Sequence, residues 1–223
     1  MKRMLLSGAI GALTLTGSAH ADLLEIGLFW NVGQGQIHYE GAFRDYITSE
    51  RTGNTGQYTV IHIALEDILR SVGAHAIAAL HIVDSGNNIY TSTPGADIDW
   101  VRFNGLSSDV TYSYDGPTPT HRAETPGQLA QRVANLDWGQ NGGGNLPSMQ
   151  FVSLGRYGTL TATLAEPHRI FGNRGFQPLT LDLSEAGNSE SFYIYAENLT
   201  FPGPGSLVCL AMGLAAPSRR RRD

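Results

Sequence analysis

Short runs of alternating apolar and polar residues occupy most of the chain between positions 23 and 200. In residues 159–164 threonines alternate with Leu160, Ala162 and Leu164, so an extended strand would have one polar and one apolar face. Glycine, asparagine, aspartate and proline separate the runs and are typical of turns. The pattern predicts about nine strands, at residues 23–32, 58–65, 76–83, 98–103, 110–114, 149–154, 159–164, 179–183 and 191–195.

Two segments have helical rather than alternating spacing. Residues 65–72 place apolar groups three and four positions apart and stop at Gly73, a residue that often ends helices. Residues 125–134 begin with Thr125 as N-cap and Pro126 at the first helical position. Many short strands with two short helices predict an all-β fold, a two-sheet antiparallel sandwich of jelly-roll type.

Both ends of the chain differ from this pattern. At the N-terminus, Lys2 and Arg3 precede an apolar segment and the small-residue site Ala19-His20-Ala21, which is the layout of a secretory signal peptide over residues 1–21. Near the C-terminus, residues 207–216 are apolar to neutral, too few to cross a bilayer as a relaxed helix. We therefore expect export, followed by transient membrane insertion of the C-terminal segment.

The C-terminal residues also resemble a known sorting signal. Pro202, Gly203, Pro204 and Gly205 precede the apolar segment, which is followed by the arginines Arg219, Arg220, Arg221 and Arg222. This layout is similar to the PEP-CTERM signal of bacterial exosortase substrates, although Gly203 stands where that family usually has glutamate. The resemblance implies processing by an exosortase-type enzyme and retention at the cell surface or in the extracellular matrix. It leaves residues 22–201 as one β-sandwich domain between the signal peptide and a sorting or anchor signal at 202–223.

Charge and cysteine content narrow the possible partners of this domain. Residues 22–201 carry nine arginines and nineteen carboxylates, a net charge of about −10, because six of the 15 basic residues and one of the 20 acids lie in the two ends. The chain's single lysine is Lys2 and its single cysteine is Cys209. An acidic surface without lysine repels phosphate backbones, so we expect no nucleic-acid binding. The domain also has no disulfide or thiol chemistry.

Two acidic, amide-rich loops are candidates for a calcium site. Asp84 and Asn87 follow one expected strand, and Asp97 and Asp99 open the next. Calcium takes six to eight oxygen ligands from carboxylates, amides and backbone carbonyls, which such loops can supply. Asp97 and Asp99 alternate, so on a regular strand they share one face, where a cation would relieve their repulsion. The alternative is turn chemistry, in which the same residue types form hydrogen-bonded turns without an ion.

Aromatic residues suggest a second kind of site. Tyr112 and Tyr114 alternate on one face of an expected strand, and Trp138 lies in a loop, so the three are candidates for stacking on sugar rings. The segments 152–155, 158–161 and 190–195 also look like parts of β-sandwich domains found in exported PEP-CTERM proteins, which are similar to galactose-binding-like folds. That resemblance implies a fold and carries over no catalytic residue.

No catalytic motif accompanies these residues: the sequence contains no Gly-x-Ser-x-Gly, no His-Glu-x-x-His and no phosphate-cradling loop. We therefore expect no enzyme but an exported, surface-retained structural or adhesive matrix protein that binds extracellular polysaccharide with calcium as its one cofactor. A purely structural protein without a small ligand is one alternative. A glycan-active enzyme on the same scaffold is the other, and it would need two convergent carboxylates.

Overall fold

The computed structural model describes residues 20–33, 36–52, 58–87, 95–106, 108–117, 125–134, 136, 151–170, 177–186 and 190–200. Residues Ala21–Thr200 form one compact unit, whose limits lie within one residue of the expected domain 22–201. The sorting signal at 202–223 and all but the last two residues of the expected signal peptide lie outside the described residues.

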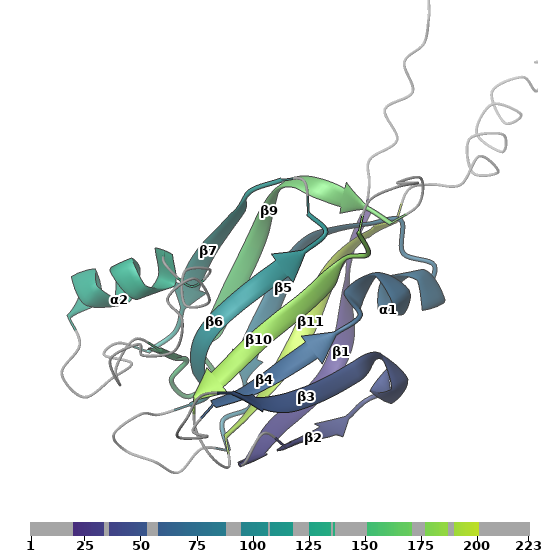
Figure 1. Cartoon of the computed structure of the whole chain (residues 1–223). Helices are drawn as coiled ribbons and strands as arrows, with labels where there is room; N and C mark the ends of the chain where they lie inside the picture. The colour runs from purple at the N-terminus through teal and green to yellow at the C-terminus, as the bar shows by residue number, and fades with distance from the viewer. Residues whose placement is uncertain are drawn as a thin grey trace, which may run out of the picture. The chain divides into compact units, whose positions relative to one another are not determined.

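The described part of the chain folds into two antiparallel sheets with two short helices and one 3-10 turn, which confirms the predicted β-sandwich (Figure 1). The six-stranded sheet has the order β2-β1-β11-β5-β9-β7, and the five-stranded sheet has the order β3-β4-β10-β6-β8. From β4 to β11 successive strands alternate between the two sheets, and β1 lies beside β11, as in a jelly roll. The elements are β1 (His20–Gly33), β2 (Gln36–Glu40), η1 (Arg44–Tyr46), β3 (Ile47–Thr52), β4 (Tyr58–Ile63), α1 (Leu65–Ser71), β5 (Ala76–Asp84), β6 (Asp97–Asn104), β7 (Val110–Asp115), α2 (Pro126–Ala134), β8 (Val152–Ser153), β9 (Thr159–Arg169), β10 (Thr180–Ala186) and β11 (Ser191–Thr200).

The hydrophobic core lies between the two sheets and is built from alternate residues of each strand. On β9, Leu160, Ala162 and Leu164 are buried while the threonines between them point away from the core. The rings of Phe29 on β1 and Phe192 on β11 stack at 5.7 Å in the centre of the six-stranded sheet. The alternation read from the sequence therefore marks which face of each strand is buried.

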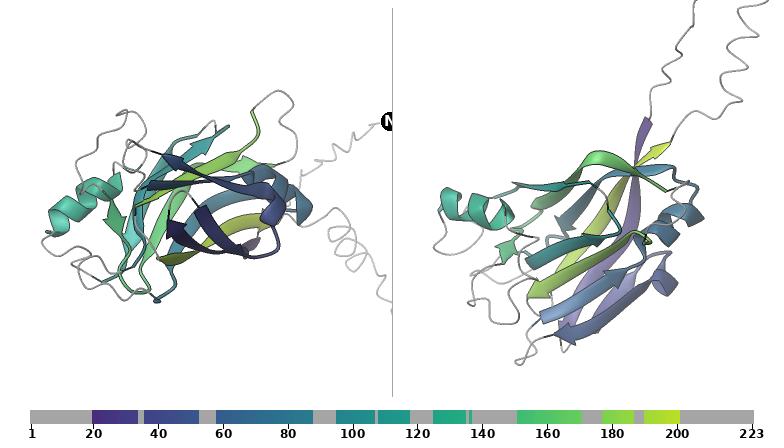
Figure 2. Two further views of the ribbon diagram at one scale, coloured as in Figure 1. Left: turned by 60° about the horizontal axis from the view of Figure 1, so that its bottom comes forward. Right: turned by 45° about the horizontal axis from the view of Figure 1, so that its top comes forward.

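Both helices fall where the sequence predicts them. In α1, Leu65, Ile68 and Leu69 are buried, and Gly73 just beyond the helix has a positive φ of 72°. In α2 the buried residues are Leu129 and Val133. The two helices lie at opposite ends of the sheets (Figure 2). No helix in the described ranges is long and apolar enough to cross a membrane.

Two strands were not predicted, and both are sheet edges. β2 ends the six-stranded sheet and β3 ends the five-stranded sheet, so each is hydrogen-bonded to a single neighbour. An edge strand can be short and polar because its outer side faces water. β2 is held by the buried Tyr39, whose hydroxyl donates to the Ile26 carbonyl at 2.7 Å and accepts the Phe43 N–H at 3.0 Å.

Candidate functional site

The carboxylate of Asp84 joins three loop segments at one end of the sandwich. Asp84 is the last residue of β5 and is 2% exposed. Its Oδ1 accepts the backbone N–H groups of Gly86 at 2.7 Å and Tyr157 at 3.1 Å. Its Oδ2 accepts the N–H of Ala96 at 3.0 Å. Both carboxylate oxygens are therefore engaged by backbone donors, as in the turn chemistry that was the alternative to calcium.

Asp97 and Asp99 have different neighbours across β6. Asp97 accepts a hydrogen bond from the hydroxyl of Ser153 on β8, and its N–H donates to Oε2 of Glu190 at 2.9 Å. Asp99 lies 3.4 Å from the hydroxyl of Ser184 on β10, which is the strand on the other side of β6. The register shifts at this point, since Ile98 pairs with Glu185 and Trp100 with Ser184, which leaves Asp99 as a bulge residue. The regular alternation that suggested a shared cation is thus interrupted.

Asn87, the fourth calcium candidate, lies in the loop after β5. Asn87 is exposed, and its backbone N–H reaches the Ser85 hydroxyl at 3.4 Å. Within the described ranges no group of three or more His, Cys, Asp or Glu side chains is placed to hold a metal ion. Calcium binding therefore stays a prediction, and the contacts of Asp84, Asp97 and Asp99 give these residues a structural role.

The expected sugar-stacking tyrosines lie on the inner face of β7. Tyr112 and Tyr114 share one face of the strand, as predicted, but both pack against the hydrophobic core. The hydroxyl of Tyr112 donates to the Val101 carbonyl at 2.9 Å, and that of Tyr114 donates to the Leu154 carbonyl at 2.6 Å. These bonds tie the edge of one sheet to the other sheet. Trp138, the third candidate, lies outside the described residues.

The outer face of the six-stranded sheet carries a different set of aromatic and polar side chains. The printed registers place these residues opposite one another across neighbouring strands. The rows are Tyr193–Val83–Thr159–Asp115, Tyr195–His81–Thr161–Ser113 and Glu197–Ala79–Thr163–Thr111 across β11, β5, β9 and β7, with Leu28–Glu40 and Trp30–His38 across β1 and β2. Most of these side chains are half-buried or exposed, so no described element covers this face.

Two pairs of stacked rings stand on this outer face. Tyr193 and Tyr195 are two residues apart on β11, with ring centroids 5.9 Å apart and planes 25° from parallel. Trp30 on β1 stacks on His38 of β2 at 4.0 Å and 21°. Stacked pairs are held in one orientation by each other, so little side-chain entropy is lost when a ligand ring packs beside them.

Hydrogen-bonding groups surround the tyrosine pair. His81 Nδ1 lies 3.1 Å from the Thr161 hydroxyl, and His81 Nε2 lies 3.7 Å from Oε2 of Glu197. Burial, together with the nearby carboxylate of Glu25 and the neighbouring Tyr193, raises the pKa of Tyr195 above its ordinary value. Like any tyrosine hydroxyl at neutral pH, that of Tyr195 is protonated and is able to donate to a ligand.

The sequence also indicates which tyrosines lie on this outer face, although the candidates Tyr112 and Tyr114 do not. In β11 the tyrosines alternate with Phe192, Ile194 and Ala196, all of which are fully buried. Because the apolar set faces the core, Tyr193 and Tyr195 must face outward. In β7 the residues that alternate with the tyrosines are threonine, serine and aspartate, which indicates the opposite orientation.

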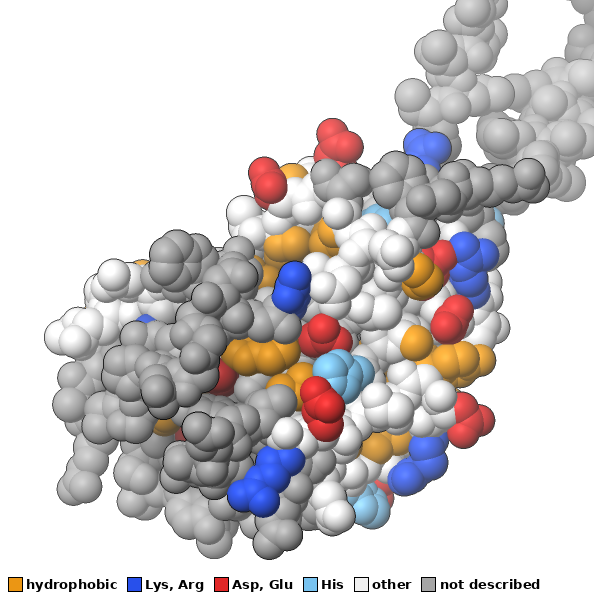
Figure 3. All heavy atoms as spheres, viewed as in Figure 1, with side chains coloured by type: hydrophobic (Ala, Val, Ile, Leu, Met, Phe, Trp, Pro, Cys, Tyr) orange, Lys and Arg blue, Asp and Glu red, His pale blue; other side chains and the backbone are white. Residues whose placement is uncertain are grey.

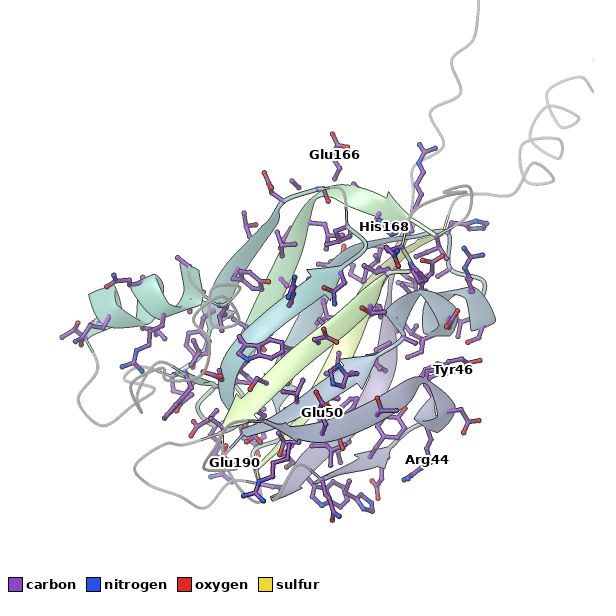
Figure 4. The ribbon with its side chains drawn as sticks, in the orientation of Figure 1. Arg44, Tyr46, Glu50, Glu166, His168 and Glu190 are labelled. Atoms are coloured by element: carbon purple, nitrogen blue, oxygen red, sulfur yellow. The ribbon has the colours of Figure 1, made fainter. Side chains whose placement is uncertain are left out.

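The outer face of the five-stranded sheet carries a separate polar network. His62 on β4 lies between two carboxylates, with Nδ1 2.8 Å from Oδ1 of Asp182 and Nε2 3.4 Å from Oε1 of Glu50. Asn104 donates to Oδ2 of Asp182 at 2.9 Å. Figure 3 shows acidic and histidine side chains beside an apolar patch on this face, and Figure 4 shows Glu50 lying over the sheet.

Asp99 belongs to the same outer face through its contact with Ser184. Burial raises the pKa of the Asp99 carboxyl from 3.8 to about 6, and the Ser184 hydroxyl offsets this in part. This carboxyl consequently holds its proton under mildly acidic conditions.

Comparison with known proteins found no relative of the chain: no protein-family model, no curated protein and no solved structure matches it.

Proposed function

We propose that the protein is an exported, surface-retained matrix component that adheres to extracellular polysaccharide through the outer face of the six-stranded sheet. The observation that carries this proposal is the pair of stacked tyrosines, Tyr193 and Tyr195, in register with hydroxyl-bearing residues of β9 and β7. Aromatic rings pack on the C–H surfaces of sugar rings, and the neighbouring hydroxyl and imidazole groups bind sugar hydroxyls. An open sheet face suits an extended polymer better than a small ligand, which usually binds in a concave pocket.

The two ends of the chain supply the rest of the proposal. Export by the general secretory route follows from the signal-peptide layout, and surface retention follows from the resemblance of residues 202–223 to a PEP-CTERM signal. An exosortase-type enzyme is the proposed processing partner. Calcium is the proposed support for the loops around Asp84.

A double variant, Tyr193→Ala with Tyr195→Ala, tests the polysaccharide-binding face. We expect the two changes to weaken binding about 30-fold or more, because truncating central aromatic residues of an interface costs roughly 2 kcal/mol or more. Affinity electrophoresis in gels that contain soluble glucans, galactans or chitin-type polymers would measure the effect. The matched control is Val72→Ala, which trims a side chain that is 44% exposed at the end of α1.

Two results would contradict the proposal. The first is no retardation by any polysaccharide, with calcium present, which would favour a purely structural protein. The second is equal retardation of the parent and the double variant, which would place binding elsewhere on the molecule.

Glycan hydrolysis is a second candidate function, favoured by the carboxylates on the outer face of the five-stranded sheet. Asp99 contacts Ser184, which is two residues from Asp182 on β10. The Cα atoms of Ser184 and Asp182 are therefore roughly 7 Å apart. Inverting glycosidases hold a protonated and an ionised carboxyl group roughly 6.5–9.5 Å apart. Asp99 would be the proton donor and Asp182, which is held by His62 and Asn104, would be the base.

Release of reducing ends from polysaccharides tests this second function. We expect any hydrolysis to fall by at least about 100-fold in both Asp99→Asn and Asp182→Asn, because general acid or base catalysis contributes on the order of 10²–10⁴-fold. Activity that survives both changes, or no activity on any polymer that binds, would rule out this pair of residues.

A further inference from the structure

The outer face of the six-stranded sheet combines aromatic rings with an unbalanced charge. Within the rows given above no position is an arginine or a lysine, whereas Glu40, Asp115 and Glu197 are carboxylates on three different strands. Beyond these rows, β9 adds one exposed arginine, Arg169, which pairs with Ala76 of β5. Glu25 on β1 is exposed and lies close enough to Tyr195 to raise its pKa. The four carboxylates lie on four different strands of this sheet, so the excess of negative charge is not confined to one point.

The charge of the whole domain has the same sign. Residues 22–201 carry about −10 net charge and contain no lysine. Such a field repels polyanions such as uronic-acid or sulfated polysaccharides and attracts polycations over distances of about a Debye length. A neutral glycan would feel neither effect.

The local geometry offers a place for a cationic group. Glu197 follows Tyr195 by two residues on the same side of β11, which puts the Cα atoms of the two residues roughly 7 Å apart along the strand. Glu197 is half-buried, and its Oε2 lies 3.7 Å from Nε2 of His81. A sugar ring that stacks on the tyrosine pair would bring a substituent within reach of Glu197. An ammonium group there is favoured both by the carboxylate and by the faces of the tyrosine rings.

We infer that the polymer bound by this face is a cationic glycan, a polysaccharide of amino sugars with free amino groups. The inference rests on the proposed polysaccharide-binding function and narrows it to one class of ligand. Charge complementarity over the whole face selects the polycation, and the stacked tyrosines Tyr193 and Tyr195 orient its sugar rings.

The test compares two ligands with the same backbone. Chitosan oligosaccharides and the fully N-acetylated chitin oligosaccharides of equal length differ in the charge of the amino group, provided that the pH is mildly acidic. We expect the chitosan form to bind about 10-fold more tightly at low salt, and the difference to shrink as salt is added. Isothermal titration calorimetry on the exported chain would measure both affinities.

Two variants distinguish binding at Glu197 from a general attraction between the acidic domain and the cationic glycan. Glu197→Gln is expected to weaken binding of the chitosan form about 5-fold and to leave the acetylated form unchanged. Asp67→Asn removes the same charge from an exposed position on α1 and is expected to change neither affinity. The double tyrosine variant should lose both ligands.

The outcomes distinguish failure of the cationic preference from failure of the proposed polysaccharide binding. If the acetylated and deacetylated forms bind equally at all salt concentrations, the cationic preference is wrong while polysaccharide binding stands. If Asp67→Asn weakens chitosan binding as much as Glu197→Gln does, the attraction is a property of the net charge and not of this face. If neither ligand nor any other polysaccharide binds, the proposed function itself fails.

Discussion

Replacing Asp84 with alanine is expected to lower the free energy of unfolding by about 4 kcal/mol. The change removes the acceptor of three backbone N–H groups, those of Gly86, Ala96 and Tyr157. Asp84 is 2% exposed, so water does not readily replace the carboxylate. Each buried donor left without an acceptor costs roughly 1–3 kcal/mol. A loss of this size is a large share of the 5–15 kcal/mol that stabilises a typical domain.

Urea unfolding in the presence of calcium and in the presence of a chelator would measure this loss and its cause. If Asp84 acts through its hydrogen bonds, the alanine variant is destabilised equally in both solutions and the parent protein is unaffected by the chelator. Asp84→Asn should lose about half as much, because one acceptor oxygen remains. A parent protein that falls to the stability of the variant when calcium is removed would instead establish Asp84 as a calcium ligand.

Asp99→Asn is expected to stabilise the protein at neutral pH by up to about 3 kcal/mol. Burial raises the pKa of this carboxyl to about 6, against 3.8 for the unperturbed group. A raised pKa means that the folded state binds the proton more tightly than the unfolded state does. The stabilising contribution of the protonated group is therefore complete below pH 3.8, declines as the pH rises and is lost above about pH 6. Asparagine has no charge to desolvate and avoids this loss.

Unfolding of the parent and the variant over pH 4 to 8 would follow this effect. The gain from Asp99→Asn should be close to zero at pH 4 and largest at pH 8, with a difference of one pKa unit corresponding to about 1.4 kcal/mol. Asp67→Asn is the control, since it makes the same substitution at an exposed position on α1. If the free energies of unfolding of the parent and the variant differ by the same amount at all pH values, burial does not disfavour the ionised form of Asp99.

The Asp99 result also bears on the second candidate function. A buried carboxyl at a bulge, kept at a cost in stability, is a common feature of catalytic sites. If Asp99→Asn stabilises the protein and also abolishes hydrolysis of a polysaccharide, the five-stranded sheet carries a catalytic site. If the variant is more stable and binds glycans normally, the raised pKa has no part in the function.

Much of the fold follows from local patterns in the sequence. The alternation in residues 159–164 and 191–195 located β9 and β11, and the spacing of apolar residues located both helices. β2 and β3 were missed because edge strands need few apolar residues; β3, for example, reads Ile-Thr-Ser-Glu-Arg-Thr. Alternation of apolar and polar residues reveals a strand only where one face of the strand is buried. Few side chains of β2 and β3 are buried.

The candidate sites were harder to place because they depend on long-range pairing. Asp97 and Asp99 were expected to share a face, but the pairing of Ser184 with Trp100 and of Glu185 with Ile98 leaves Asp99 unpaired in a bulge. The acceptor role of Asp84 depends on Tyr157, which lies 73 residues away in the sequence. Nothing in the local sequence around Asp84 indicates that partner.

The position of β11 has a mechanical consequence under the proposed matrix role. This strand carries Tyr193 and Tyr195, and it ends at Thr200, next to the proposed sorting signal. In the six-stranded sheet β11 lies between β1 and β5, so hydrogen bonds hold it on both sides. Tension between a bound polymer and a tethered C-terminus would thus travel along a few residues of one strand. The strand under load is a central one, whose release requires two ladders of hydrogen bonds to break.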